Sequence, residues 1–271
     1  MRIATWNVNS VLARLPRLLD WLGTAEPDVL CLQEIKTSAH DFPYDGVSAL
    51  GYEVAAHGTG RWNGVAILSR VGIEDERRGL AGEPGYQPED AMFEAHEPRA
   101  MGATCGGLRV WTVYVPNGRE VGHAHYDYKL RWLSALRDTV AEELATESRG
   151  ERFVVLGDFN IAPSDADVWD ASAVHGATHV SAPERAKLEE LRDLGLSDVV
   201  PRALKNDTPY TYWDYRAGMF HKNQGMRIDL VYASASVAGS VTDAYVDREA
   251  RKGKLPSDHA PVVVDLTGPI G

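Results

Sequence analysis

The run Phe153-Val154-Val155-Leu156 is followed at once by Gly157-Asp158-Phe159-Asn160. Four consecutive apolar residues, two of them β-branched and one aromatic, are typical of a strand that is buried on both faces. A glycine then breaks the run, and a carboxylate and an amide come directly after it. This stretch therefore predicts a buried strand whose carboxyl end presents polar side chains.

The same organisation recurs in five further segments. They are 2–8 with Asn7 and then Asn9, 28–34 with Glu34, 108–115 with Tyr114 and then Asn117, 227–233 with Asp229, and 261–266 preceded by Asp258 and His259. A charged residue in an apolar strand costs free energy unless it is paired or bound to a metal. We therefore expect these carboxylates and amides to converge on one rim. An oxygen-rich set of this kind favours a hard cation such as Mg²⁺.

The remaining periodicity sets the fold class. We expect further strands at 64–70, 92–96, 100–104 and 241–247, and helices at 12–22, 126–147 and 183–194, with Pro16 tolerable in a first helical turn. Strands outnumber helices and do not alternate strictly with them. This pattern predicts an α/β sandwich of two packed sheets with helices outside, not a doubly wound sheet. No repeat or linker-like boundary is visible, so we expect one domain over residues 1–271.

Composition narrows the class of protein. Hydrophobic residues make up 44% of the 271 residues, but no stretch approaches the roughly 20 apolar residues of a membrane span. No long apolar segment follows Met1, and the two cysteines, Cys31 and Cys105, lie in apolar surroundings without a disulfide framework. We therefore expect a cytoplasmic protein with no membrane partner. The net charge of -11 counts against bulk attraction to nucleic acid, although local charge governs binding and metal-binding carboxylates add to the negative total.

Six motifs, taken in order, resemble exonuclease III and the abasic-site endonucleases of the endonuclease-exonuclease-phosphatase superfamily. They are Trp6-Asn7-Val8-Asn9-Ser10, Leu32-Gln33-Glu34, Tyr114-Val115-Pro116-Asn117, Gly157-Asp158-Phe159-Asn160, Arg227-Ile228-Asp229 and Ser257-Asp258-His259-Ala260-Pro261. One motif alone would be weak, but together they span nearly the whole chain. The resemblance implies a DNase I-like, four-layer sandwich of two mixed β-sheets flanked by helices, with the active site at one edge.

The resemblance also implies a role for each residue. Glu34 would be the main ligand of Mg²⁺, with help from Asn7 and Asp258, and Mn²⁺ would be able to replace Mg²⁺. Asp158 would orient or deprotonate the attacking water, and Asn160, Asn7 and Asn117 would hold the substrate. His259 would contact the phosphate, oriented by Asp229 and with Tyr114 beside it. Attack on a phosphodiester builds negative charge on the phosphoryl oxygens and the leaving oxygen, which a metal and fixed donors stabilise. A water nucleophile also needs an oriented proton acceptor, which a carboxylate supplies.

The aromatic-then-basic stretch 211–229 is similar to the DNA-cleaving branch of the superfamily. In that branch an apolar slot accepts a baseless sugar, and Tyr212, Met226 and Ile228 match its positions. The implied activities are incision 5′ to abasic sites, 3′–5′ exonuclease action and cleaning of 3′ ends. The expected substrate is double-stranded DNA with abasic sites or 3′ ends, and we expect the protein to act as a monomer. Basic residues expected near the DNA include Arg61, Arg99, Arg119, Lys129, Arg216, Lys222, Arg227, Arg251, Lys252 and Lys254, with Arg119 and Arg216 in groove-entering loops.

Several alternatives remain open at this point. The same superfamily contains phosphatases and lipid phosphodiesterases, and a DNA-binding repair scaffold without catalysis is a further possibility. Locally, Asp229 could pair with Arg227 or Lys222, Glu34 could cap a strand next to Lys36, and Tyr212 could be an ordinary core aromatic. A zinc half-site at His175 and His179 is disfavoured, because no glutamate lies between them and Gly176 weakens a helix there.

Two departures from the family pattern bear on the expected site. Asn9 stands where some relatives have an aspartate, which weakens a second carboxylate-rich metal site. Met226 stands where some relatives have a bulky aromatic, and its flexible thioether predicts a looser slot.

Overall fold

The chain folds into two stacked β-sheets, described by a computed structural model for residues 1–87, 92–146, 150–204 and 208–267. Within these ranges the first sheet has seven strands, in the order β10 (Arg202–Ala203), β12 (Val241–Val246), β13 (Val262–Leu266), β1 (Arg2–Asn7), β2 (Val29–Gln33), β4 (Val65–Ser69) and β3 (Glu53–His57). The second has six, in the order β5 (Glu74–Arg78), β6 (Ala100–Cys105), β7 (Leu108–Tyr114), β8 (Phe153–Asp158), β11 (Asp229–Ala233) and β9 (Ser197–Asp198). Both sheets are mixed, since β1 runs parallel to β2 but antiparallel to β13, and β7 runs parallel to β8.

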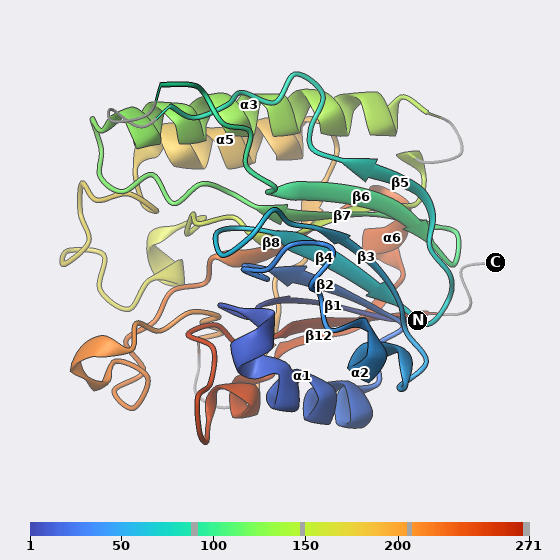
Figure 1. Ribbon diagram of the computed structural model, residues 1–271. Coiled ribbons are helices and arrows are strands. Elements are labelled where there is room, and N and C mark those ends of the chain that lie inside the picture. The colour runs from blue at the N-terminus through green and yellow to red at the C-terminus, as the bar shows by residue number, and fades with distance from the viewer. Residues whose placement is uncertain (88–91, 147–149, 205–207, 268–271) are drawn as a thin grey trace.

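Helices cover the outer face of each sheet, so the molecule has four layers (Figure 1). α1 (Val11–Ala25) and α2 (Tyr44–Ser48) lie on the first sheet, and α3 (Ala124–Leu144) and α5 (Ala182–Asp193) lie on the second. The other short elements are α6 (Ala235–Gly239) and the 3-10 turns η1 (Asp165–Asp167), η2 (Arg216–Gly218) and η3 (Arg248–Arg251). The predicted four-layer sandwich is therefore confirmed.

Because side chains alternate along each strand, the two sheets contribute to three hydrophobic cores. One lies between the sheets and one lies under each helical layer. In β2, Val29 and Cys31 point into the core between the sheets, whereas Leu30 and Leu32 pack under the first helical layer. Successive side chains of a strand point to opposite faces, so a strand covered on both sides must be apolar throughout. This is why these strands read as continuous hydrophobic runs, each fully buried aliphatic side chain stabilising the fold by roughly 1.5–3 kcal/mol.

Strand directions bring the predicted polar residues to one edge. The parallel pairs β1–β2 and β7–β8 end at the left of Figure 1, away from both termini. β11 runs antiparallel to β8, with its first residue, Asp229, opposite Asp158. The same edge therefore receives strand ends from both sheets.

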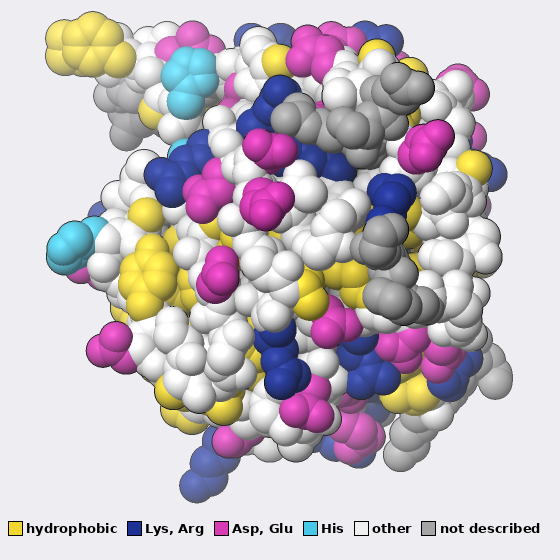
Figure 2. Space-filling model, turned by 90° about the vertical axis from the view of Figure 1, so that its right-hand side faces the viewer, with side chains coloured by type: hydrophobic (Ala, Val, Ile, Leu, Met, Phe, Trp, Pro, Cys, Tyr) yellow, Lys and Arg dark blue, Asp and Glu magenta, His cyan; other side chains and the backbone are white. Residues whose placement is uncertain are grey.

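The opposite end of the molecule, which carries the two termini, has no such concentration of one side-chain type. Figure 2 shows acidic and basic side chains interspersed there with hydrophobic ones. No helix in the described ranges is long and apolar enough to cross a membrane.

Some predicted elements differ from the structure. The strand expected at 92–96 is wrong: only Ala95 forms a bridge, to Tyr86, and Met92 and Phe93 are 85% and 78% exposed. β3 and β5 were not predicted, because their residues lack an apolar run; all five residues of β5 are exposed. α1 begins at Val11, so Pro16 lies in its second turn, not its first. Glu147, the expected end of the helix from 126, lies outside the described residues, and α3 ends at Leu144.

Candidate active site

Asn7 joins the two central carboxylates of the edge. Its side-chain nitrogen donates to Glu34 Oε1 at 2.8 Å and to Asp158 Oδ2 at 2.9 Å. Asn7 ends β1 in one sheet and Asp158 ends β8 in the other, so this amide links the two sheets. Its oxygen accepts the backbone N–H of Asn9 at 3.0 Å. In this arrangement the Asn7 amide orients the two carboxylates. Its side-chain oxygen does not point to Glu34, although the sequence predicted Asn7 as a metal ligand.

His259 lies between two buried carboxylates. Its Nδ1 bonds to Asp229 Oδ2 at 2.8 Å, and its Nε2 lies 3.8 Å from Asp158 Oδ2. Burial lowers the pKa of His259, but the charges of Asp229 and Asp158 outweigh it and raise the pKa to about 10. The ring is therefore an imidazolium at neutral pH. The alternative in which Asp229 pairs with Arg227 or Lys222 is wrong, because Arg227 bonds to Asp167 and Asp198 instead.

The pKa of Asp158 is also raised, but here burial is the main cause. His259 opposes the effect of burial, Asp229 and Glu34 add to it, and the result is a pKa of about 7. A carboxylate with a pKa near the working pH is suited to accept a proton during a reaction. One oxygen of Asp158 also accepts the backbone N–H of Asn160 at 2.9 Å, which fixes the carboxylate in the turn after β8.

The next-to-last residue of β8, Gly157, has to be a glycine. Its φ is +151°, and a Cβ there would lie 2.0 Å from the carbonyl oxygen of Val113 on β7. A larger residue would force β7 and β8 apart. The glycine thus allows the close strand pairing that holds Tyr114 and Asp158 side by side in register.

Glu34 follows β2 in a left-handed conformation, with φ 51°. Its second oxygen pairs with Lys36 Nζ at 2.7 Å. Burial raises the pKa of Glu34, but Lys36 and the hydrogen bonds from Lys36 and Asn7 outweigh it and hold the pKa below its ordinary value. Asp258 lies on the other side of Asn9, accepting from the Asn9 amide at 3.1 Å.

Tyr114, Asn160 and Asn117 complete this edge. Burial and the charge of Glu34 raise the pKa of Tyr114 well above its ordinary value, so its hydroxyl stays protonated and can donate. The Asn160 amide donates to the carbonyl of Val115 at 2.9 Å. Asn117 is exposed and donates to Asn160 Oδ1 at 3.4 Å. Tyr114 is thus next to Glu34 and Asp158, and Asn160 is held by Val115 and Asp158.

The predicted slot residues do lie together. Ile228 packs with Ala162 and Val168, and Tyr212 and Met226 lie against this cluster. The centre of the Tyr212 ring is 4.9 Å from that of the His259 ring. A cavity of about 160 Å³ opens here, lined by Trp169, His179, Tyr212, Asp214, Met219, Gln224, Gly225 and Met226. Ile228 is behind this lining, because it is 2% exposed.

His179 belongs to this cavity and not to a zinc site. Residues 171–177 form turns and not a helix, and His175 is exposed. The His179 ring bonds to the carbonyl of Asn160. Burial and the charge of Lys129 lower its pKa to about 4, so it is neutral at physiological pH.

Three basic residues expected near DNA are instead internal. Lys129 is fully buried and pairs with Glu184, and its Nζ also donates to the carbonyls of Asn160 and Asn117. Its predicted contact with substrate is therefore wrong: it supports the turn behind the site. Arg99 and Arg227 are likewise buried in ion pairs. Arg119 and Arg216 are exposed near the rim, Arg216 in a bidentate pair with Asp214.

A metal ion has a suitable place at Glu34. One potential ligand atom from each of Glu34, Asp158 and His259 lies within 4.8 Å of the others. Carboxylate oxygens are the ligands that a hard cation prefers, so we assign the carboxylates to such an ion. One or two carboxylates with waters suit Mg²⁺.

Sequence reasoning did not predict the ion pair of Lys36 with Glu34, and it did not place Trp169 or His179 beside the site. Lys36 lies two residues after Glu34, and a cation so close to an isolated carboxylate was the only available signal. Trp169 and His179 come from a loop without strand or helix periodicity, so nothing in the sequence placed them beside Tyr212.

Comparison with known proteins agrees with this geometry. A model of the Endonuclease/Exonuclease/phosphatase family matches residues 4–259. The chain is 30% identical to Exodeoxyribonuclease III of Haemophilus influenzae, over 97% of this chain and 98% of that protein. A structure of the 3′-5′ exonuclease NExo from Neisseria meningitidis has 38% identity and a TM-score of 0.89, covering 98% of this chain and 99% of that one. The same neisserial protein is described elsewhere as a 3′ phosphatase bound to product DNA hairpin.

An AP endonuclease from Archaeoglobus fulgidus matches with 32% identity and a TM-score of 0.87, over 99% of this chain and all of that one. Both the family model and full-length relatives thus cover the residues that form the edge described above. The chain belongs to the endonuclease/exonuclease/phosphatase family, within its exonuclease III and AP endonuclease group.

Proposed function

We propose that this protein hydrolyses DNA phosphodiesters in DNA repair, with 3′–5′ exonuclease activity, cleaning of 3′ ends and incision 5′ to abasic sites. The observation that carries this proposal is the buried pair of Asp158 and His259, a proton acceptor and a cation 3.8 Å apart, beside the carboxylate of Glu34. Relatives named for exonuclease and AP endonuclease activity support the choice of DNA.

Each group then has one task in the reaction. Asp158 accepts a proton from the attacking water, which its pKa near 7 permits at neutral pH. The imidazolium of His259 stabilises the negative charge that develops on the phosphoryl oxygens, and Asp229 keeps it protonated and oriented. Tyr114 donates to the same phosphate. The Asn160 amide is already engaged by Val115 and Asp158, so Asn160 positions Asp158 instead, and Asn7 holds Glu34 and Asp158 in place.

We propose Mg²⁺ as the cofactor, held by Glu34, with Mn²⁺ able to replace it. When bound, the ion would supply charge stabilisation to the phosphate and leaving oxygen. The donor set of carboxylates and amides suits this hard cation. The enzyme would act in the cytoplasm as a monomeric single domain, on double-stranded DNA.

The finer substrate preference rests on the Tyr212 cavity. Its lining of Tyr212, Met226 and Trp169 is apolar-faced, which suits a sugar without a base. His179 occupies part of the same wall. A frayed 3′ terminus needs less of this cavity than a flipped internal sugar, so we expect 3′-end activity to be substantial beside abasic incision.

Matched duplexes test the proposal. One carries an internal abasic site, one a recessed 3′ hydroxyl and one a 3′ phosphate, each incubated with and without Mg²⁺. We expect Mg²⁺-dependent products from all three, and a loss of at least about 10²-fold in turnover for Asp158→Asn. Asp170→Asn, an exposed aspartate outside the site, serves as the matched control. Cleavage that survives Asp158→Asn, or that appears without any divalent ion, would overturn the assignment.

A further inference from the structure

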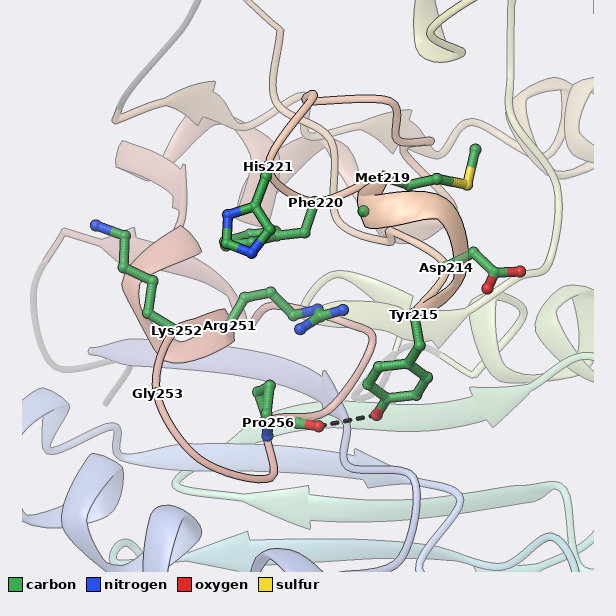
Figure 3. Close-up of a pocket in the computed structure, with 10 residues that line it drawn as sticks. Asp214, Tyr215, Met219, Phe220, His221, Arg251, Lys252, Gly253 and Pro256 are labelled. Carbon is green, nitrogen blue, oxygen red and sulfur yellow. Dashed lines mark hydrogen bonds between the residues drawn. The ribbon is translucent and has the colours of Figure 1, made fainter.

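A second cavity lies beside the edge, next to the Tyr212 slot, with which it shares Asp214 and Met219. It has a volume of about 280 Å³ and is formed by two loops, 214–221 and 251–256 (Figure 3). Its lining includes Tyr215, Phe220, His221, Arg251 and Lys252. The lining therefore combines aromatic rings with cationic side chains.

Arg251 is the unusual member of this lining. It is only 6% exposed, and its guanidinium lies 4.9 Å from the ring centres of both Tyr215 and Phe220. Its one hydrogen bond within the described ranges is from Nη2 to the carbonyl of Trp213 at 3.3 Å, and its Nε has no partner. No carboxylate in those ranges forms an ion pair with it.

The other charges of the cavity are already compensated. Lys252 pairs with Glu249 at 2.6 Å, and Asp214 pairs with Arg216 at 2.6 Å. A buried guanidinium without a counter-ion is costly, and contact with aromatic rings returns only roughly 0.5–2 kcal/mol. Arg251 therefore has unused capacity to bind an anion.

Nearby guanidinium groups strengthen this positive region. Arg14 and Arg17 of α1 and Arg248 of η3 also bond only to carbonyl or hydroxyl oxygens in the described part of the chain. Arg17, for example, holds the carbonyl of Ala250 at 2.7 Å. In a chain with a net charge of -11, these four arginines gather positive charge at one corner, although the charges of Glu249 and Asp258 act on Arg248 and Arg251.

The cavity is connected to the reacting edge by two hydrogen bonds. The Tyr215 hydroxyl donates to the carbonyl of Pro256 at 2.8 Å and accepts from the Asn9 amide at 3.4 Å. The same Asn9 amide donates to Asp258. A group bound at Arg251 would thus lie on the Asp258 side of the site.

We propose that this cavity binds a phosphate group other than the scissile one, with Arg251 as its anchor. The guanidinium matches phosphate oxygens with paired donors, and Tyr215 and Phe220 hold its plane. The phosphate could come from the DNA backbone or from a released 5′-mononucleotide, and both present the same chemistry. The inference rests on the proposed action on DNA only for the source of the phosphate.

The test compares Arg251→Met with Arg137→Met, an exposed arginine on α3, both in an Asp158→Asn background that does not cleave. Inorganic phosphate and a 5′-mononucleotide are titrated against each protein at constant ionic strength. We expect Arg251→Met to weaken binding of both roughly 10–100-fold, as for a lost hydrogen bond to a charged group. The Arg137 control should bind like its parent.

Binding of uncleaved duplex DNA identifies the source of the phosphate. If the phosphate comes from the backbone, Arg251→Met should lower the slope of log affinity against log salt for uncleaved duplex by about 0.9. If that slope is unchanged while mononucleotide binding falls, the site holds the released product. Phosphate binding is measured without catalysis, so it succeeds or fails independently of nuclease activity.

A second variant covers the case in which Arg251→Met does not fold. His221→Glu places a carboxylate at the exposed mouth of the cavity and leaves the buried guanidinium in place. It should also weaken phosphate binding. Phosphate and duplex binding equal to the Arg137→Met control, in whichever of the two variants folds, would overturn the proposal and leave Arg251 as a packing residue.

Discussion

Replacing Asp229 with asparagine should alter the pH dependence of the reaction more than its rate at neutral pH. The substitution keeps the shape and an oxygen that can accept from His259 Nδ1, now at 2.8 Å, but removes the charge. An opposite charge at this distance shifts a pKa by roughly 1–3 units. The pKa of His259, about 10 in the parent, should fall by that amount.

Activity should fall at alkaline pH, because the raised pKa belongs to the cationic form of His259. The imidazolium is present below the pKa of His259 and is lost as pH rises through it, so the parent should lose activity only near pH 10. For a two-unit fall, turnover of Asp229→Asn should stay within a few-fold of the parent at pH 7 and drop by about tenfold at pH 9. This corresponds to about 2.7 kcal/mol removed from the protonated form.

Turnover on a single-site duplex from pH 6 to 10.5 at saturating Mg²⁺ measures this effect. Asp243→Asn, which disrupts an exposed pair with Arg202, is the matched control. A loss of the same size at pH 7 and pH 9 would mean that Asp229 acts through local structure. An alkaline limb that stays near pH 10 would mean that its charge does not maintain the imidazolium.

Three further outcomes are expected. Glu34→Ala should weaken Mg²⁺ binding at least about tenfold by calorimetry and abolish Mg²⁺-dependent cleavage, and unchanged Mg²⁺ affinity would contradict its role as ligand. Tyr212→Ala should lower the ratio of abasic incision to 3′ degradation under one Mg²⁺ concentration; a constant ratio would make Tyr212 a core residue. Lys129→Met should cost roughly 3–5 kcal/mol in unfolding experiments, because it leaves Glu184 charged and buried, yet leave the salt dependence of DNA affinity unchanged. A smaller salt slope for that variant would place Lys129 on the DNA backbone after all.

The polar edge was predictable because charged residues are rare in strands that are otherwise apolar. Asp158, Glu34 and Asp229 are carboxylates at the ends of runs that are otherwise apolar, and strands covered on both sides leave few other reasons for such residues. The layer order was predictable for the same reason, since those apolar runs require cover on two faces.

The errors arose where a side chain's partner is distant in sequence. Lys129 seemed available for DNA because its buried partner, Glu184, comes 55 residues later in the chain. β5 is a strand only because β6 provides an edge to pair with, and its own charged residues give no strand pattern. At residues 92–96, by contrast, the local preference for strand had no partner strand to satisfy it.

The amide of Asn7 that joins the sheets has a consequence for how the protein becomes active. Trp6, next to it, donates to the carbonyl of His259, so the first and last strands meet 253 residues apart in the chain. Contacts of such long sequence separation form late and slowly in folding. During synthesis, therefore, the chain should acquire nuclease activity only after β13 has left the ribosome, and a shortened chain ending before His259 should keep several strands and yet cut nothing. Cells would thereby avoid releasing a DNA-cutting fragment from an unfinished polypeptide.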